Sequence, residues 1–158
     1  MHKFSRRVIL GATLAVPWAA ETVAGPSTDP RPPVYPGPDQ ALVYFYVPQI
    51  EQLNGYFFDI YLNGVKLVQL TNRQYTWIYM KSGVLNLEVR MPYFLEKEQV
   101  KFSPFVKGGE ISYLRFRTEL GEKYIYGLFE AVPKLEAMRD MRSAMYEKLV
   151  QGWPTGPE

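Results

Sequence analysis

The chain has 158 residues, of which 22% are charged and 47% hydrophobic, a composition typical of one folded domain rather than a disordered chain. It contains no cysteine, which excludes disulfides, thiolate nucleophiles, Cys-ligated zinc and lipid attachment through an N-terminal cysteine. The aromatic share of 15%, with 12 tyrosines, favours strands, because flat rings pack well on pleated surfaces.

Residues 1–24 have the parts of an export signal. The start is basic and free of acidic residues, and the run at 8–20 is almost wholly apolar. This run is shorter than the roughly 20 residues that span a membrane, so we expect no transmembrane span in the mature protein. Small residues lead up to Ala24. We therefore expect a signal peptide that is cleaved after Ala24, and export to the periplasm.

The basic start also resembles the twin-arginine export motif, in which two arginines precede a variable residue and two apolar ones. The residues that carry this resemblance are Ser5, Arg6, Arg7, Val8, Ile9 and Leu10. Gly11 then departs from the lysine often found at the next position, so the general secretory route is the alternative. A twin-arginine signal is an address read by a receptor, and its pathway moves folded proteins, which a chain without disulfides can be.

Cleavage at this point changes the charge of the protein. It removes three of the 18 basic residues and one of the 16 acidic residues, so the mature chain is formally neutral. The charged residues lost are Lys3, Arg6, Arg7 and Glu21. Nucleic-acid binding depends on a surplus of Lys and Arg facing phosphates, and it loses its main support.

The mature chain also lacks the residues of common catalytic and metal sites. The only histidine, His2, leaves with the signal peptide. Without His and Cys, the chain can form neither a Ser-His-Asp nor a Cys-His site, and no imidazole-ligated metal site. We therefore expect no metal, no cofactor and no enzymatic activity.

Residues 25–39, GPSTDPRPPVYPGPD, predict a proline-rich linker. Proline fixes φ and removes backbone donors, so this stretch is expected to be an extended or disordered tether. The alternative is a partner motif, since Pro30 and Pro33 have a P-x-x-P spacing.

Short apolar stretches separated by turn residues occupy residues 40–131. Asn63-Gly64 is the strongest hairpin signal, because both residues tolerate the positive φ of a type I′ turn. No helical period lies between the strands, and the pattern predicts an all-β fold, an antiparallel β-sandwich of about eight strands (Ig-like or transthyretin-like) with a C-terminal helix. The expected strands are 41–47, 57–62, 65–70, 74–80, 84–91, 99–102, 110–120 and 123–129.

The helix is predicted over 132–151, with a tail at 152–158. Pro133 suits the first helical turn, and Pro154 prevents continuation. Apolar residues recur at helical spacing, which predicts a stripe that packs on the sandwich or covers an open sheet edge. The alternative is a Met-rich surface for a partner, since thioethers adapt to varied shapes. The stripe consists of Leu135, Met138, Met141, Met145 and Leu149.

The order of these features resembles a family of bacterial exported β domains carried by many small lipoproteins. The stretches that carry the resemblance, over about residues 41–145, are ALVYFYVP, the Asn63-Gly64 hairpin, LVQL, LNLEVR, Gly108-Gly109-Glu110 with ISYLRFR, and Leu128-Phe129-Glu130 before a helix. The family is labelled only as a domain of unknown function, so the resemblance implies export and fold class but no catalytic residues. This chain departs from the lipoprotein members because it has no cysteine to carry a lipid.

An aromatic strand is the first candidate for ligand binding. Tyr75, Trp77 and Tyr79 alternate along one strand, so their rings share one face of the sheet. Such a face can stack on sugar rings while each phenol supplies a hydrogen bond. The alternative is that these rings fill the interior of the sandwich or stiffen a half-exposed sheet.

Charged residues offer two further candidates. A hydrolase built on two carboxylates needs them about 5–10 Å apart, and the acids considered are Asp59, Glu88, Glu96, Glu98 and Glu110. Arg115 and Arg117, two apart on a strand, would hold an anion side by side. Pairing with cross-strand acids is the commoner outcome for such arginines.

These observations favour a non-catalytic, exported binding or adaptor module of the bacterial envelope, whose partner is an envelope protein or a glycan. The second hypothesis is a carbohydrate-binding module that uses the face of Tyr75. The third is a carboxylate-based hydrolase.

Overall fold

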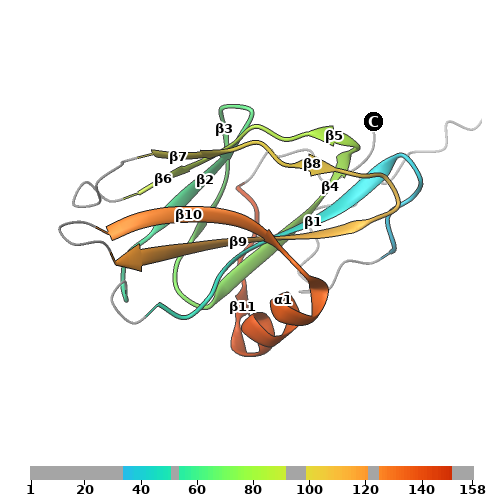
Figure 1. Ribbon diagram of the computed structural model, residues 1–158. Coiled ribbons are helices and arrows are strands. Elements are labelled where there is room, and N and C mark those ends of the chain that lie inside the picture. Colours follow the sequence, from blue (N-terminus) through green and yellow to red (C-terminus); the bar gives the residue numbers. More distant parts are fainter. Residues whose placement is uncertain (1–33, 51–53, 92–98, 121–124, 151–158) are drawn as a thin grey trace, which may run out of the picture.

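The computed structural model describes residues 34–50, 54–91, 99–120 and 125–150. Two sheets lie face to face, and a short helix lies against the outer side of one of them (Figure 1). The predicted all-β sandwich with a C-terminal helix is confirmed. The signal peptide, the tail at 152–158, and Glu96 and Glu98 lie outside the described residues.

The larger sheet has five strands within the described residues and is mixed. β1 pairs antiparallel with β4 but parallel with β9, and the whole smaller sheet lies between β1 and β9 in sequence. This long excursion allows the parallel pairing, which a tight turn cannot make. In spatial order the strands are β10 (Ile125–Val132), β9 (Ile111–Leu120), β1 (Gln40–Val47), β4 (Gln74–Lys81) and β11 (Met145–Tyr146).

The smaller sheet is antiparallel throughout. The turn between β2 and β3 is made by Asn63 with φ 49° and Gly64 with φ 80°, as the Asn-Gly pair predicts for a type I′ hairpin. In spatial order the strands are β3 (Val65–Leu70), β2 (Phe58–Leu62), β6 (Leu87–Arg90) and β7 (Gln99–Phe102).

The strand predicted at 84–91 is interrupted. Gly83–Val84 (β5) pairs with Phe105–Val106 (β8), whereas β6 pairs with β2 and β7. Between them, Leu85 donates its backbone N–H to the Pro104 carbonyl, 2.9 Å away. The chain therefore changes partners at this point, which alternation of apolar residues alone does not reveal.

The inner faces of the two sheets form the main core. On β1 the inward residues Ala41, Val43, Phe45 and Val47 are completely buried. They pack against side chains of the smaller sheet such as Phe58, Ile60, Leu62, Leu87 and Val89. This burial of large apolar side chains is the dominant stabilising contribution to the fold.

β1 is buried on both of its faces. Tyr46 points to the outer side of the larger sheet, where it forms a second, smaller cluster with Tyr113, Ala137 and Met141. The last two residues belong to the segment that includes α1 (Lys134–Asp140) and a 3₁₀ turn (Met141–Ser143). The helical segment therefore covers an apolar outer face of the larger sheet, which two sheets alone would leave exposed to solvent.

The helix predicted over 132–151 is wrong in extent, because α1 ends at Asp140. Beyond Ala144 the backbone donors find partners on two sheet edges. Met145 N–H donates to Arg73 O (2.7 Å) and Glu147 N–H to Tyr75 O (2.8 Å). Val150 N–H then donates to Leu67 O on β3 (2.9 Å). These tertiary hydrogen bonds replace helical ones, and the segment joins the edges of β4 and β3.

The end of the proline-rich linker is part of the folded domain. Pro36 is buried, and the Gly37 carbonyl accepts hydrogen bonds from the backbone N–H groups of Gln40 (3.1 Å) and Gly109 (3.0 Å). The predicted tether is thus wrong for residues 34–39, because these bonds and the burial of Pro36 hold them against the domain. Pro30 and Pro33 lie outside the described residues. Among the helices that the structure describes, none is long and apolar enough to cross a membrane.

Candidate functional site

The predicted aromatic face is a packed layer. Tyr75, Trp77 and Tyr79 do share the outer face of β4, but Trp77 is only 8% exposed. Its ring stacks on Tyr146 at 6.1 Å between centroids and meets Tyr79 edge-on at 5.8 Å. The structure therefore supports packing, rather than stacking on a ligand, as the role of these rings. A sugar ring has no open indole face to stack on.

Two further segments, one near each end of the described chain, contact this layer. Tyr146 of β11, the strand beside β4, contacts the rings of Trp77 and Tyr75, and the Tyr79 hydroxyl accepts a hydrogen bond from Val34 N–H at 3.2 Å. Tyr44 continues the layer toward Tyr113, with ring centroids 5.1 Å apart. Burial, followed by the neighbouring phenols, raises the pKa of Tyr44 well above its ordinary value. Tyr44 therefore serves as a neutral packing group.

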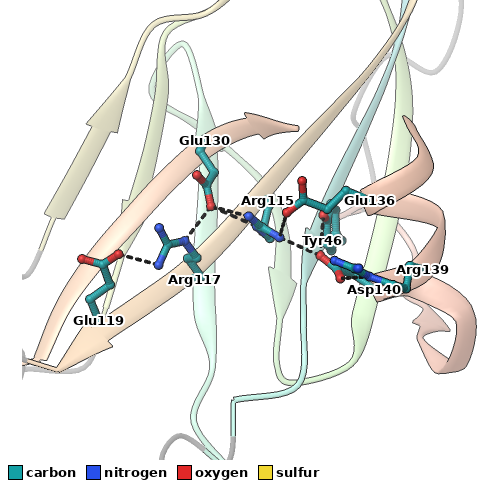
Figure 2. Close-up of polar contacts among 8 residues, drawn as sticks. All are labelled: Tyr46, Arg115, Arg117, Glu119, Glu130, Glu136, Arg139 and Asp140. Atoms are coloured by element: carbon teal, nitrogen blue, oxygen red, sulfur yellow. Dashed lines mark hydrogen bonds and ion pairs between the residues drawn. The ribbon is translucent and has the colours of Figure 1, made fainter. Parts of the chain in front are cut away.

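Arg115 joins α1 to the larger sheet (Figure 2). Its guanidinium contacts three carboxylates: Glu130 on β10 at 2.8 Å, and Glu136 and Asp140 on α1 at 2.6 and 2.8 Å. Tyr46 also donates its hydroxyl to Asp140, at 3.1 Å. Burial works against the charged Arg115, but the hydrogen bonds with these carboxylates outweigh it and raise its pKa. We call Arg115, Glu130, Glu136 and Asp140 the Arg115 cluster.

Arg117 extends the Arg115 cluster along β9 (Figure 2). It binds Glu130 through Nε at 2.6 Å and Glu119 through a second nitrogen. Glu130 is the direct cross-strand partner of Arg115 in the β9–β10 pairing. Both arginines thus bind acidic side chains of the same chain. The structure supports the alternative expectation, that these arginines pair with cross-strand acids, rather than an anion site.

The described candidate acids of the hydrolase hypothesis are each paired with a base. Asp59 contacts Lys66 at 2.7 Å, and Glu88 contacts Arg90 at 2.6 Å. Glu110 contacts Lys107 at 2.7 Å. In the part of the chain that the structure describes, no three His, Cys, Asp or Glu side chains are placed to hold a metal ion.

The outward side of α1 carries exposed apolar side chains next to charged groups. Leu135 is 85% exposed and Met138 is 46% exposed. With Arg139 and Arg142 they follow the i, i+3, i+4, i+7 spacing of one helical face and line a shallow hollow, to which Pro133 and Glu136 also contribute. We call Leu135, Met138, Arg139 and Arg142 the α1 outer face.

The predicted stripe is therefore divided. Leu135 and Met138 lie on the α1 outer face, and Met145 on β11 is also exposed. Met141 is buried in the cluster over the larger sheet, whereas Leu149 packs against the main core. Sequence reasoning missed Arg139 and Arg142, although their spacing from Leu135 was the available signal.

The fold and the site together define an all-β sandwich that carries, on a helix fixed by ion pairs, a small cationic and apolar surface. No protein-family model, no curated protein and no solved structure matches this chain.

Proposed function

We propose that this protein is an exported, non-catalytic binding or adaptor module of the bacterial envelope, and that the α1 outer face is its contact surface. The observation that carries the proposal is the exposure of Leu135 and Met138 on a helix that the Arg115 cluster holds against the sheet. Exposed apolar side chains on a fixed element are typical of interaction sites.

Export is supported by the N-terminal sequence. The basic start, the short apolar run and the small residues before Ala24 fit a cleaved signal peptide, and the paired Arg6 and Arg7 favour the twin-arginine route. Replacement of both by lysine (Arg6→Lys, Arg7→Lys) should trap the uncleaved precursor inside the cell. Fractionation followed by intact-mass measurement tests this. Normal export of the double variant would leave the general secretory route as the better account.

A non-catalytic role is supported by the residue types that the mature chain would retain. It would have neither His nor Cys, so a catalytic site would depend on carboxylates, tyrosines or lysines. The described carboxylates singled out above are each held by a basic partner, and the tyrosines of the outer layer are packed together.

The contact surface is tested by capture from envelope extract. The doubly substituted protein Leu135→Ser, Met138→Ser should lose its captured material, because serine removes the apolar contact without disturbing the buried side of α1. The matched control is Val84→Ser, Phe105→Ser, since this cross-strand pair is also exposed, at 61% and 66%. If the control loses its captured material and the α1 variant does not, the contact surface is the β5–β8 strand pair and the proposal is wrong.

A further inference from the structure

We propose that the α1 outer face docks on a membrane surface that contains anionic phospholipids. This inference rests on the function proposed above and names the partner of the same surface. It starts from the way α1 separates its charges. Glu136 and Asp140 both turn toward Arg115, whereas Arg139 and Arg142 are exposed beside Leu135 and Met138.

The separation is a consequence of the Arg115 cluster. Arg115 binds both acids of α1, at 2.6 and 2.8 Å, and so offsets much of their charge, although Glu136 stays 34% exposed at the edge of the same hollow. Arg139 approaches Asp140 only at 3.9 Å, and its side chain stays 72% exposed. The α1 outer face therefore presents two exposed arginines, although α1 itself contains two acids and two bases, because Arg142 follows in the 3₁₀ turn. The surface that complements it is anionic, with an apolar layer below the charges.

The size and shape of this face favour a bilayer over a protein. A stable protein interface takes about 20–30 residues from each partner, and a seven-residue helix presents only a few outward side chains. A bilayer interface, in contrast, accepts a few apolar side chains together with Lys and Arg near the headgroups. α1 also lies on the outside of the larger sheet, on the side away from the smaller sheet, where it can meet a flat surface (Figure 1).

The test uses the protein isolated after export and sedimented with vesicles of phosphatidylcholine, with or without phosphatidylglycerol. The protein should bind the anionic vesicles, and binding should fall as salt is raised. Each of Arg139→Gln and Arg142→Gln should weaken partitioning roughly fivefold, and Leu135→Ser should weaken it by about tenfold. The control Lys101→Gln removes an exposed charge from β7 of the smaller sheet and should leave partitioning unchanged.

Absence of binding to anionic vesicles at low salt would overturn the lipid inference. If Leu135→Ser, Met138→Ser nevertheless loses a captured envelope protein, the partner is a protein, and the proposed function stands without the lipid. If Lys101→Gln weakens vesicle binding as much as Arg142→Gln does, binding is through overall charge, and the assignment to α1 is wrong.

Discussion

Replacement of Arg115 by alanine is the sharpest perturbation of the contact between α1 and the sheet. Arg115 is the shared partner of three carboxylates, and its side chain is 15% exposed. After Arg115→Ala, Glu136 and Asp140 would face each other across the space that the guanidinium filled. Tyr46 would keep its hydrogen bond with Asp140, but the helix would lose its charged link to β9.

The magnitude follows from the partial burial of the cluster. Surface ion pairs contribute about 0–1 kcal/mol, whereas removal of one partner from a buried pair costs about 3–5 kcal/mol. Arg115 lies between these limits, so Arg115→Ala should lower the free energy of unfolding by about 2–3 kcal/mol. Arg117→Ala is the matched control. Its side chain is 35% exposed, and its loss should cost about 1 kcal/mol or less.

The assay is equilibrium unfolding in urea at neutral pH, followed by tryptophan fluorescence. Trp77 is suited to this readout because Tyr146, its stacking partner, is on the segment that follows α1. Arg115→Lys should fall between wild type and Arg115→Ala, since an ammonium keeps the charge but not the planar fork that reaches several carboxylates. Equal losses for Arg115→Ala and Arg117→Ala would refute the reasoning that Arg115 fixes α1.

Three further predictions concern stability. Gly108→Ala should lower the free energy of unfolding by more than about 1 kcal/mol, because the added Cβ would lie 1.9 Å from the Pro38 carbonyl oxygen. Gly37→Ala is the control: an added Cβ there has nothing within 4 Å, so its melting temperature in a thermal scan should be nearly that of wild type. Burial alone would raise the pKa of Glu130, but hydrogen bonds from Arg117 and Arg115 outweigh it and hold that pKa below the ordinary 4.5. The Glu130 carboxylate therefore stabilises the fold above that value, and this contribution is lost as pH falls through the folded pKa. The free energies of unfolding of Glu130→Gln and wild type should therefore differ at pH 7 and converge in acid. A difference that stays the same at both pH values would contradict the assignment. Trp77→Ala should cost about 3–5 kcal/mol in urea unfolding, and a cost below about 1 kcal/mol, typical of a surface residue, would show that the indole is not packed as described.

The strands were predictable because their signals are local. The hairpin at Asn63-Gly64 needs positive φ at two adjacent residues, and the strand that follows it, Val65–Leu70, has the predicted bounds. Alternation also placed Tyr75, Trp77 and Tyr79 on one face of β4. It did not reveal that Tyr146 of the neighbouring strand packs against Tyr75 and Trp77, because Trp77 and Tyr146 are 69 residues apart in the sequence.

The C-terminal helix and the site show where local signals fail. The spacing of Met141, Met145 and Leu149 fits a helix, but the backbone after Ala144 pairs with the edges of β4 and β3 instead. Which charges of α1 point outward is likewise a tertiary property. Only the position of Arg115 on β9 determines that Glu136 and Asp140 turn inward and leave the arginines of the α1 outer face exposed.

The central claim, that the protein meets its partner through the α1 outer face, is tested most directly by site-specific photo-crosslinking in living cells. A photoreactive amino acid would be placed in place of Met138 and, in a separate strain, in place of Lys101 on the opposite sheet. The account predicts crosslinked product from position 138, with phospholipid as the attached mass, and none from position 101. Product from position 101 alone would contradict the claim.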